Sequence, residues 1–164
     1  MILVLAIDPG LNSPGFGVFD AEQCKLLCSG SIQEHTKGQP LPQRINQITC
    51  DLDERLKPLL ELQPQLMVVI EEPHTFSGRR SRGSRDSNSL LKLCFIVGAL
   101  IQWGLEKTSY VFTVKVRDYR GQIPKTEAAR RMKLKYKKQW RTNDESDAVF
   151  LGDWWILNRM KTND

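Results

Sequence analysis

The chain has 164 residues, of which 40% are hydrophobic, a size and composition that suit one domain (1–164) with a single buried core. Lys and Arg outnumber Asp and Glu by 24 to 19, and the resulting net charge of +5 favours a polyanionic partner. The longest apolar runs fall far short of the roughly 20 residues that cross a bilayer, and no basic stretch precedes the apolar N-terminus. We therefore expect no membrane span and no secretion signal.

Four cysteines could in principle bind metal or form disulfides. Cys24, Cys28, Cys50 and Cys94 lack the paired spacing of a zinc site, and nothing in the sequence indicates an oxidising compartment. The expectation is that they are buried free thiols.

The first part of the chain predicts three strands. Residues 2–7 are continuously apolar, which is typical of a central strand buried on both faces, and Asp8 follows at the strand end. Residues 15–19 and 24–32 are two further predicted strands, joined by a polar turn at 20–23. We expect these three strands to form an antiparallel meander.

The middle of the chain predicts a helix, a strand and a loop. In 41–62 the apolar residues recur at steps of three and four, which indicates an amphipathic helix that Pro58 kinks or ends. The apolar run 66–70 is too short for an ordinary helix and predicts a buried strand ending at Glu71. The segment 73–88 is rich in Gly, Ser and Arg without an apolar period, so we expect a flexible surface loop.

The remaining elements complete an alternation of helices and strands. A mostly apolar helix is predicted at 90–105, a short strand at 110–114 and a basic helix at 125–138. Residues 143–146 have the composition of a helix cap and open a last helix that ends near residue 158. The sequence therefore predicts an α/β protein with a mixed five-stranded sheet flanked by helices.

Three separate segments each place a carboxylate beside apolar structure. Asp8 and Glu71 follow predicted strands, while Asp144 and Asp147 are three residues apart and share one face of the last helix. Clustered carboxylates repel one another unless a cation lies among them, and hard oxygen ligands suit Mg²⁺ or Mn²⁺. Taken singly, Asp8 could cap a turn, Glu71 could be a solvated strand end and Asp144 could be a helix N-cap.

The combination of these motifs resembles a known family. Ile7-Asp8-Pro9-Gly10, Gly15-Phe16-Gly17-Val18, Ile70-Glu71 and Asp144-x-x-Asp147-Ala148 occur in the order and at the approximate spacing of the RuvC family of Holliday-junction resolvases. In that family the first strand ends in Ile-Asp-Pro-Gly, a Gly-aromatic-Gly begins the second, a Glu ends the fourth, and Asp-x-x-Asp-Ala opens the last helix. The resemblance covers nearly the whole chain and implies an RNase H-like fold.

The resemblance also implies roles for individual residues. Asp8, Glu71, Asp144 and Asp147 would be the metal-binding catalytic set, with Glu72 a bystander. Lys125 resembles the family lysine that opens the penultimate helix near the scissile phosphate.

The expected DNA contacts come from two regions. The family often carries an aromatic residue three positions after the catalytic glutamate, where this chain has His74, so Phe76 becomes the candidate for stacking at the junction. The arginines of the 73–88 loop would form a DNA clamp more basic than in bacterial members. Together with the further basic positions matched by the family, the expected DNA contacts are Phe76, Arg79, Arg80, Arg82, Arg85, Lys115, Arg117, Arg120 and Lys125.

The activity implied by the resemblance is metal-dependent cleavage of four-way DNA junctions. Two Mg²⁺ or Mn²⁺ ions per site would activate water, giving paired symmetric nicks with 5′-phosphate and 3′-hydroxyl ends. Two equivalent strands must be cut, so a homodimer is expected. No nucleotide cofactor is expected, and the compact length suits a phage-encoded member acting in the cytoplasm of a bacterial or phage-infected cell.

Three other functions fit parts of the pattern. A flap or replication-fork endonuclease would use the same fold and the same acids. A non-catalytic DNA-binding module would gain nothing from acids that face phosphate. An actin-like ATP-binding protein also begins with Asp-x-Gly and a glycine-rich hairpin, but such proteins close two related domains over the nucleotide. Cleavage assays and a nucleotide-dependent thermal shift discriminate among them.

Overall fold

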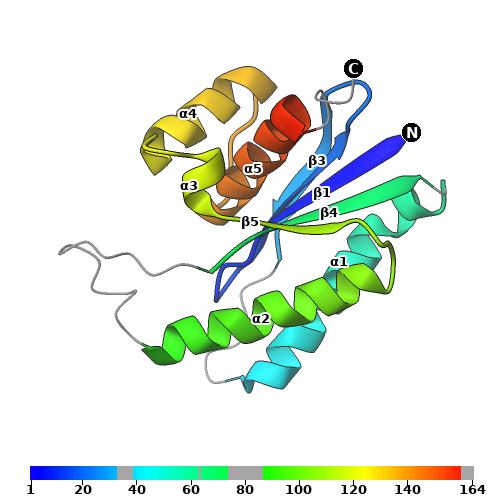
Figure 1. Ribbon diagram of the computed structural model, residues 1–164, viewed down its shortest axis with the longest axis vertical. Helices are drawn as coiled ribbons and strands as arrows, with labels where there is room; N and C mark the ends of the chain where they lie inside the picture. The colour runs from blue at the N-terminus through cyan, green and yellow to red at the C-terminus, as the bar shows by residue number, and fades with distance from the viewer. Residues whose placement is uncertain (33–38, 63, 74–86, 160–164) are drawn as a thin grey trace.

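A computed structural model of the chain describes residues 1–32, 39–62, 64–73 and 87–159. Within them a five-stranded sheet with the order β3-β2-β1-β4-β5 lies between two layers of helices (Figure 1). The strands are β1 (Ile2–Asp8), β2 (Gly15–Asp20), β3 (Lys25–Ser31), β4 (Gln65–Glu71) and β5 (Val111–Val114). The helices are α1 (Leu41–Leu60), α2 (Ser87–Leu105), α3 (Val116–Tyr119), α4 (Lys125–Tyr136) and α5 (Asn143–Arg159).

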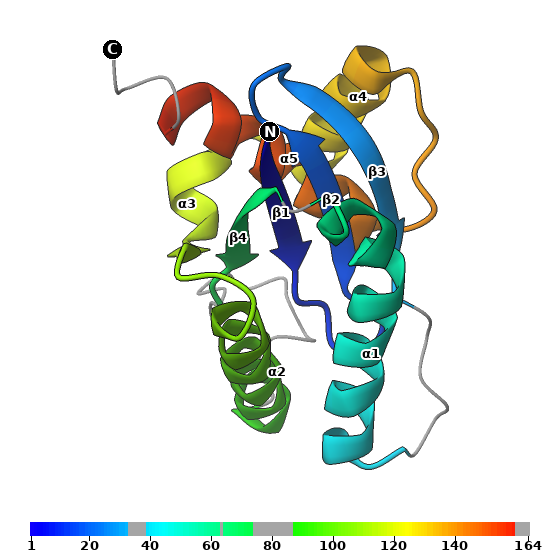
Figure 2. The ribbon, with the colours of Figure 1, turned by 90° about the vertical axis from the view of Figure 1, so that its right-hand side faces the viewer.

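The sheet is mixed, as the sequence predicts. β1 pairs antiparallel with β2, and β2 pairs antiparallel with β3. On its other side β1 pairs parallel with β4, which in turn pairs parallel with β5. The arrows in Figure 2 show β1 and β4 running in the same direction with β2 opposed to them. The antiparallel meander and the mixed five-stranded sheet are therefore confirmed.

β1 is the centre of the sheet and explains the continuous apolar run at the N-terminus. Leu3, Leu5 and Ile7 belong to a core shared with α1 and α2. The alternate residues Val4 and Ala6 belong to a second core shared with α3, α4 and α5. Because side chains alternate across a strand, a strand covered on both faces must be apolar at every position.

Several boundaries differ from the predicted ones. Cys24 has φ 51°, a left-handed conformation that belongs to a turn, so β3 begins at Lys25. α1 continues through Pro58 and ends at Leu60, two residues before the predicted end. α2 begins at Ser87, inside the stretch expected to be a loop. The other residues of that stretch are described only up to Pro73, so the rest of the loop prediction lies outside the described residues.

The cysteine prediction is wrong. Cys28, Cys50 and Cys94 are exposed and Cys24 is only partly buried, although all four are free thiols. Cys28 lies on the edge strand β3, while Cys50 and Cys94 lie on outward-facing positions of α1 and α2. Composition favours buried cysteines on average, but the helix and strand periods decide which face each one occupies.

The start of α5 is fixed by two side-chain hydrogen bonds around Thr142, one residue before the predicted cap. The Thr142 hydroxyl accepts a hydrogen bond from the Glu145 amide at 3.0 Å, and the Glu145 carboxylate accepts one from the Arg141 amide at 2.8 Å. The same carboxylate accepts a hydrogen bond from Ser29 on β3 and pairs with Lys138 at 3.0 Å. The first turn of α5 is therefore tied both to its own backbone and to the sheet.

Loss of the cap should weaken the fold. We expect Thr142→Ala to lower the free energy of unfolding by about 1 kcal/mol, the usual cost of removing a threonine N-cap. Thr126→Ala is the matched control, because Thr126 is exposed in the first turn of α4, a helix without a side-chain cap hydrogen bond. Urea unfolding would measure both variants, and equal values would contradict a capping role for Thr142.

Candidate active site

Two of the four predicted catalytic acids lie side by side at one edge of the sheet. Asp8 is the last residue of β1 and Glu71 the last residue of β4. Their predecessors Ile7 and Ile70 are paired in the parallel register, so the two acids leave neighbouring strands at the same level. Both residues are largely removed from solvent, with relative exposures of 7% for Asp8 and 9% for Glu71. A central strand pair thus delivers both carboxylates to one place.

The other two acids approach from α5, across a contact that only small residues permit. A Cβ atom on Gly15 would lie 2.0 Å from the carbonyl oxygen of Asp144, and one on Gly10 would lie 2.2 Å from its Oδ2 atom. Both glycines therefore let the first turn of α5 pack directly on the β1–β2 connection and its flanks. One turn further along, Asp147 is only 2% exposed.

The acids influence one another electrostatically. Burial raises the pKa of Asp8 well above its usual value, and repulsion from Glu71, Asp144 and Asp147 raises it further. Burial is also the main cause of the raised pKa values of Glu71 and Asp144, and Asp147 adds to both. The pattern is that of a buried cluster with too much negative charge, which a bound cation would relieve.

Two cations of the chain already bind this cluster, both at Oδ2 of Asp147. The Lys125 ammonium lies 2.6 Å from that oxygen and Arg120 Nη1 lies 3.2 Å from it. Arg120 is buried, whereas 52% of the Lys125 side chain is exposed. Burial lowers the pKa of Lys125, but the hydrogen bond and attraction of Asp147 outweigh this and raise it overall.

The donor set fits a hard divalent cation. Four carboxylates with excess negative charge are the ligands that Mg²⁺ and Mn²⁺ prefer. Among the residues that the structure describes, no three acidic, histidine or cysteine side chains already converge on one point as ligands. Since Lys125 lies on Asp147, its ammonium would have to move for that oxygen to bind a metal.

Sequence reasoning missed one member of the site, Tyr119. Its hydroxyl donates a short hydrogen bond to Oε2 of Glu71, and its side chain is buried. Tyr119 lies on α3, a single turn that carries no helical period, so no signal in the sequence could have placed it. Glu72, the residue after Glu71, accepts a hydrogen bond from Thr113 at 2.9 Å.

Apart from Lys125, which binds Asp147, the predicted DNA contacts divide into three groups. Lys115 and Arg117 are exposed where β5 passes into α3, as a contact with phosphate requires. Arg120 was expected on that surface, but its guanidinium is buried against Asp147 because the α3 turn directs it inward, so it belongs to the acid cluster instead. The remaining candidates lie outside the described residues: Phe76, Arg79, Arg80, Arg82 and Arg85.

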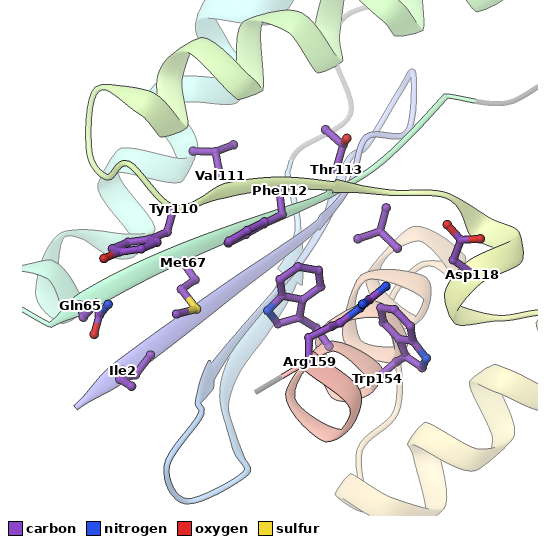
Figure 3. Close-up of a pocket in the computed structure, with 12 residues that line it drawn as sticks. Ile2, Gln65, Met67, Tyr110, Val111, Phe112, Thr113, Asp118, Trp154 and Arg159 are labelled. Atoms are coloured by element: carbon purple, nitrogen blue, oxygen red, sulfur yellow. The ribbon is translucent and has the colours of Figure 1, made fainter. Parts of the chain in front are cut away.

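A separate groove of about 890 Å³ runs along the edge strand β5 (Figure 3). Phe112 and Trp155 form part of its wall, with ring centroids 4.8 Å apart, and Asp118 and Arg159 add one charge of each sign. None of the four acids of the candidate site lines this groove. The groove and the acid cluster are therefore separate features of the surface.

Comparisons of the sequence with protein-family models and with curated proteins find no match. Solved structures do match. RuvC of Thermus thermophilus in complex with a Holliday junction substrate has a TM-score of 0.73 and 22% identity, covering 98% of this chain and 97% of that one. A second structure of Thermus thermophilus RuvC has a TM-score of 0.70 and 22% sequence identity, and the match covers 96% of each chain. The yeast mitochondrial Holliday junction resolvase Ydc2 has a TM-score of 0.57 and 12% sequence identity. That match covers 93% of this chain and 77% of the yeast chain.

The sheet order and the two layers of helices define an RNase H-like fold. Within that class, the structural matches show that the chain has the fold of the RuvC resolvases over nearly its whole length. The fold implied by the sequence resemblance is therefore confirmed.

The electrostatics of the cluster predict how stability depends on pH. A carboxyl group with a raised pKa holds its proton longer in the folded than in the unfolded protein, so stability falls as pH rises from about 4 through the raised pKa. Asp8→Asn removes this loss. Without metal at pH 7 it should melt higher than the parent protein, by about 2–4 °C for each kcal/mol of relieved repulsion.

The control for this prediction is Glu54→Gln, which changes an exposed acid on α1. Calorimetry between pH 4 and 8 in the presence of chelator would show the difference between Asp8→Asn and the parent growing with pH, with Glu54→Gln unchanged. A parent protein as stable as Asp8→Asn at pH 7 would contradict the strained cluster.

Proposed function

We propose that this protein is a divalent-metal-dependent endonuclease of the RuvC type that resolves four-way DNA junctions by paired symmetric nicks. The observation that carries the proposal is the meeting of four acids from three distant segments, Asp8, Glu71 and the pair on α5, in one mutually repelling cluster. Asp8, Glu71 and Asp147 are buried there and Asp144 is partly buried. The cluster lies in a fold shared with RuvC. Burying acids that repel one another costs stability, and such a cost is typical of a site retained for function.

In the proposed mechanism the four acids hold the metal and the basic residues hold the DNA. When bound, Mg²⁺ or Mn²⁺, in the proposal two ions, would supply activation of a water molecule and offset negative charge on the leaving 3′ oxygen, so that the products would carry 5′-phosphate and 3′-hydroxyl ends. Asp8 would be the central ligand, because Glu71, Asp144 and Asp147 all lie close enough to raise its pKa. Burial of Asp8, Glu71 and Asp147 excludes bulk water and strengthens each electrostatic contact.

Lys125 has a distinct part in this mechanism. Its ammonium rests on Asp147 while half of its side chain is exposed, so it can exchange the carboxylate for a phosphate oxygen when DNA arrives. That exchange would free an oxygen of Asp147 and place a positive charge beside the scissile phosphate. Arg120 is buried and stays with Asp147, holding the acid in place.

The preference for a junction is supported by the structural matches. The Thermus thermophilus protein is described in complex with a Holliday junction substrate, and the yeast match is described as a Holliday junction resolvase. The exposed Lys115 and Arg117, close in sequence to Tyr119 of the acid cluster, offer phosphate contacts. A flap or fork endonuclease would use the same cluster, so substrate comparison decides between them.

A homodimer is part of the proposal, and α2 offers a surface for it. Leu91 and Phe95 are each 56% exposed one turn apart, and Leu105 is also exposed. The stretch Asn88–Leu105 is long and apolar enough to cross a membrane by length and composition alone, with 28% of it buried in the structure. In a protein that cuts two symmetric strands, self-association through this face would cover the apolar residues and pair the active sites.

The proposed activity is tested by cleavage of a labelled four-way junction with Mg²⁺ or Mn²⁺, beside matched duplex, flap and fork substrates. We expect paired nicks at symmetric positions in the junction, with no cleavage by Asp8→Asn or in chelator, because the central ligand is lost. Glu54→Gln should cut like the parent protein. A preference for flaps or forks would overturn the junction as the proposed substrate and leave the metal-dependent mechanism standing. Tight DNA binding without cleavage in either metal would overturn the catalytic proposal.

The dimer surface has its own test. Phe95→Glu should convert a dimer into a monomer in analytical ultracentrifugation, because it places a charge in an apolar contact. Leu134→Glu is the matched control, since Leu134 is 64% exposed on α4, in the other helical layer. A parent protein that sediments as a monomer, or a dimer that survives Phe95→Glu, would exclude α2 as the interface.

A further inference from the structure

Tyr119 connects the helix that carries two of the acids to the strand that carries a third. Its hydroxyl donates to Oε2 of Glu71 on β4. Its ring packs beside Phe150 and Trp154 of α5, with centroid distances of 5.9 and 6.3 Å. The side chain is 4% exposed, so the ring has little freedom to rotate away from these contacts.

The position of the hydroxyl is therefore fixed by the same helix that supplies Asp144 and Asp147. β5 pairs with the end of β4, with Val114 opposite Glu71, and the chain then turns directly into α3. This connection places Tyr119 one turn beyond the strand end, within reach of the glutamate. Arg120, the next residue, binds Asp147 in the same way. One short segment thus contacts acids from two different elements.

We propose that Tyr119 is a positioning residue for metal binding, which acts by orienting the Glu71 carboxylate through its hydroxyl. A carboxylate at a strand end can rotate about its side-chain torsions, and a hydrogen bond to one oxygen directs the other toward the cluster. Partners that orient metal ligands typically contribute a factor of roughly 10 to 100 in metal affinity. The inference rests on the proposed function, because it takes Glu71 to be a ligand.

The chain contains a matched control for this bond. The hydroxyl of Tyr136 on α4 donates a similarly short hydrogen bond to Asp153 of α5, and Tyr136 is also partly buried. Asp153 is not among the four acids of the candidate site. Tyr136→Phe therefore removes the same kind of hydrogen bond without touching Glu71, and it reports what the loss of such a bond does to the fold alone.

The experiment measures Mn²⁺ binding to the full chain without DNA, by calorimetry and by electron paramagnetic resonance of free Mn²⁺. We expect Tyr119→Phe to weaken binding by roughly 10- to 100-fold and Tyr136→Phe to leave it unchanged. In the Glu71→Gln background, Tyr119→Phe should have no further effect, because the residue it acts through has lost its charge. Thermal unfolding of each variant verifies that it is folded at the temperature of the binding measurement.

The outcomes separate the inference from the proposed function. If Glu71→Gln weakens Mn²⁺ binding but Tyr119→Phe does not, the metal site stands and the role of Tyr119 is overturned. Tighter binding by Tyr119→Phe would also overturn it, because the hydroxyl would then compete with the metal for Glu71. If Glu71→Gln itself leaves binding unchanged, Glu71 is not a ligand and both proposals fail. An equal loss of Mn²⁺ affinity in Tyr119→Phe and Tyr136→Phe would also overturn the inference, because general destabilisation of the fold would then explain both losses.

Discussion

Repulsion between buried carboxylates is the constraint around which this structure is organised. Asp8 lies at the end of the central strand, where its pKa is raised by burial and by repulsion from Glu71, Asp144 and Asp147. Each charged carboxylate has a lower free energy in water than in this buried site, and the repulsion among the four acids opposes the packing that brings them together. The hydrophobic cores on the two faces of the sheet must therefore supply enough stability to hold the cluster closed.

The chain offsets part of this repulsion with its own cations and hydrogen-bond donors. Arg120 and Lys125 share one oxygen of Asp147, and Tyr119 donates to Glu71. All three come from the stretch between β5 and the first turn of α4. That stretch has little regular structure, yet it contacts acids from both β4 and α5, so it couples the sheet to the helix across the site.

The sequence was sufficient to predict those parts of the structure that a period or an apolar run encodes. Asp8 and Glu71 were placed at strand ends because the runs before them are fully apolar, and the three-residue step between Asp144 and Asp147 put them on one helix face. The contacts of Tyr119 with Glu71 and of Arg120 with Asp147 could not be predicted, because a one-turn helix has no period and its direction is set by tertiary packing. The exposed cysteines were missed for a related reason: composition carries no information about which face a residue occupies.

The distribution of the acids along the chain links chemical competence to completion of folding. Asp8 and Asp147 are separated by well over a hundred residues, and bringing them into one cluster requires α5 to dock on a sheet assembled from the preceding segments. Contacts of such high sequence separation form late, because the entropy of closing the intervening chain must first be overcome. A nascent or proteolysed chain that lacks α5 retains Asp8 and Glu71 but not the other two acids. For the proposed nuclease, this arrangement would keep incomplete molecules harmless to the DNA around them.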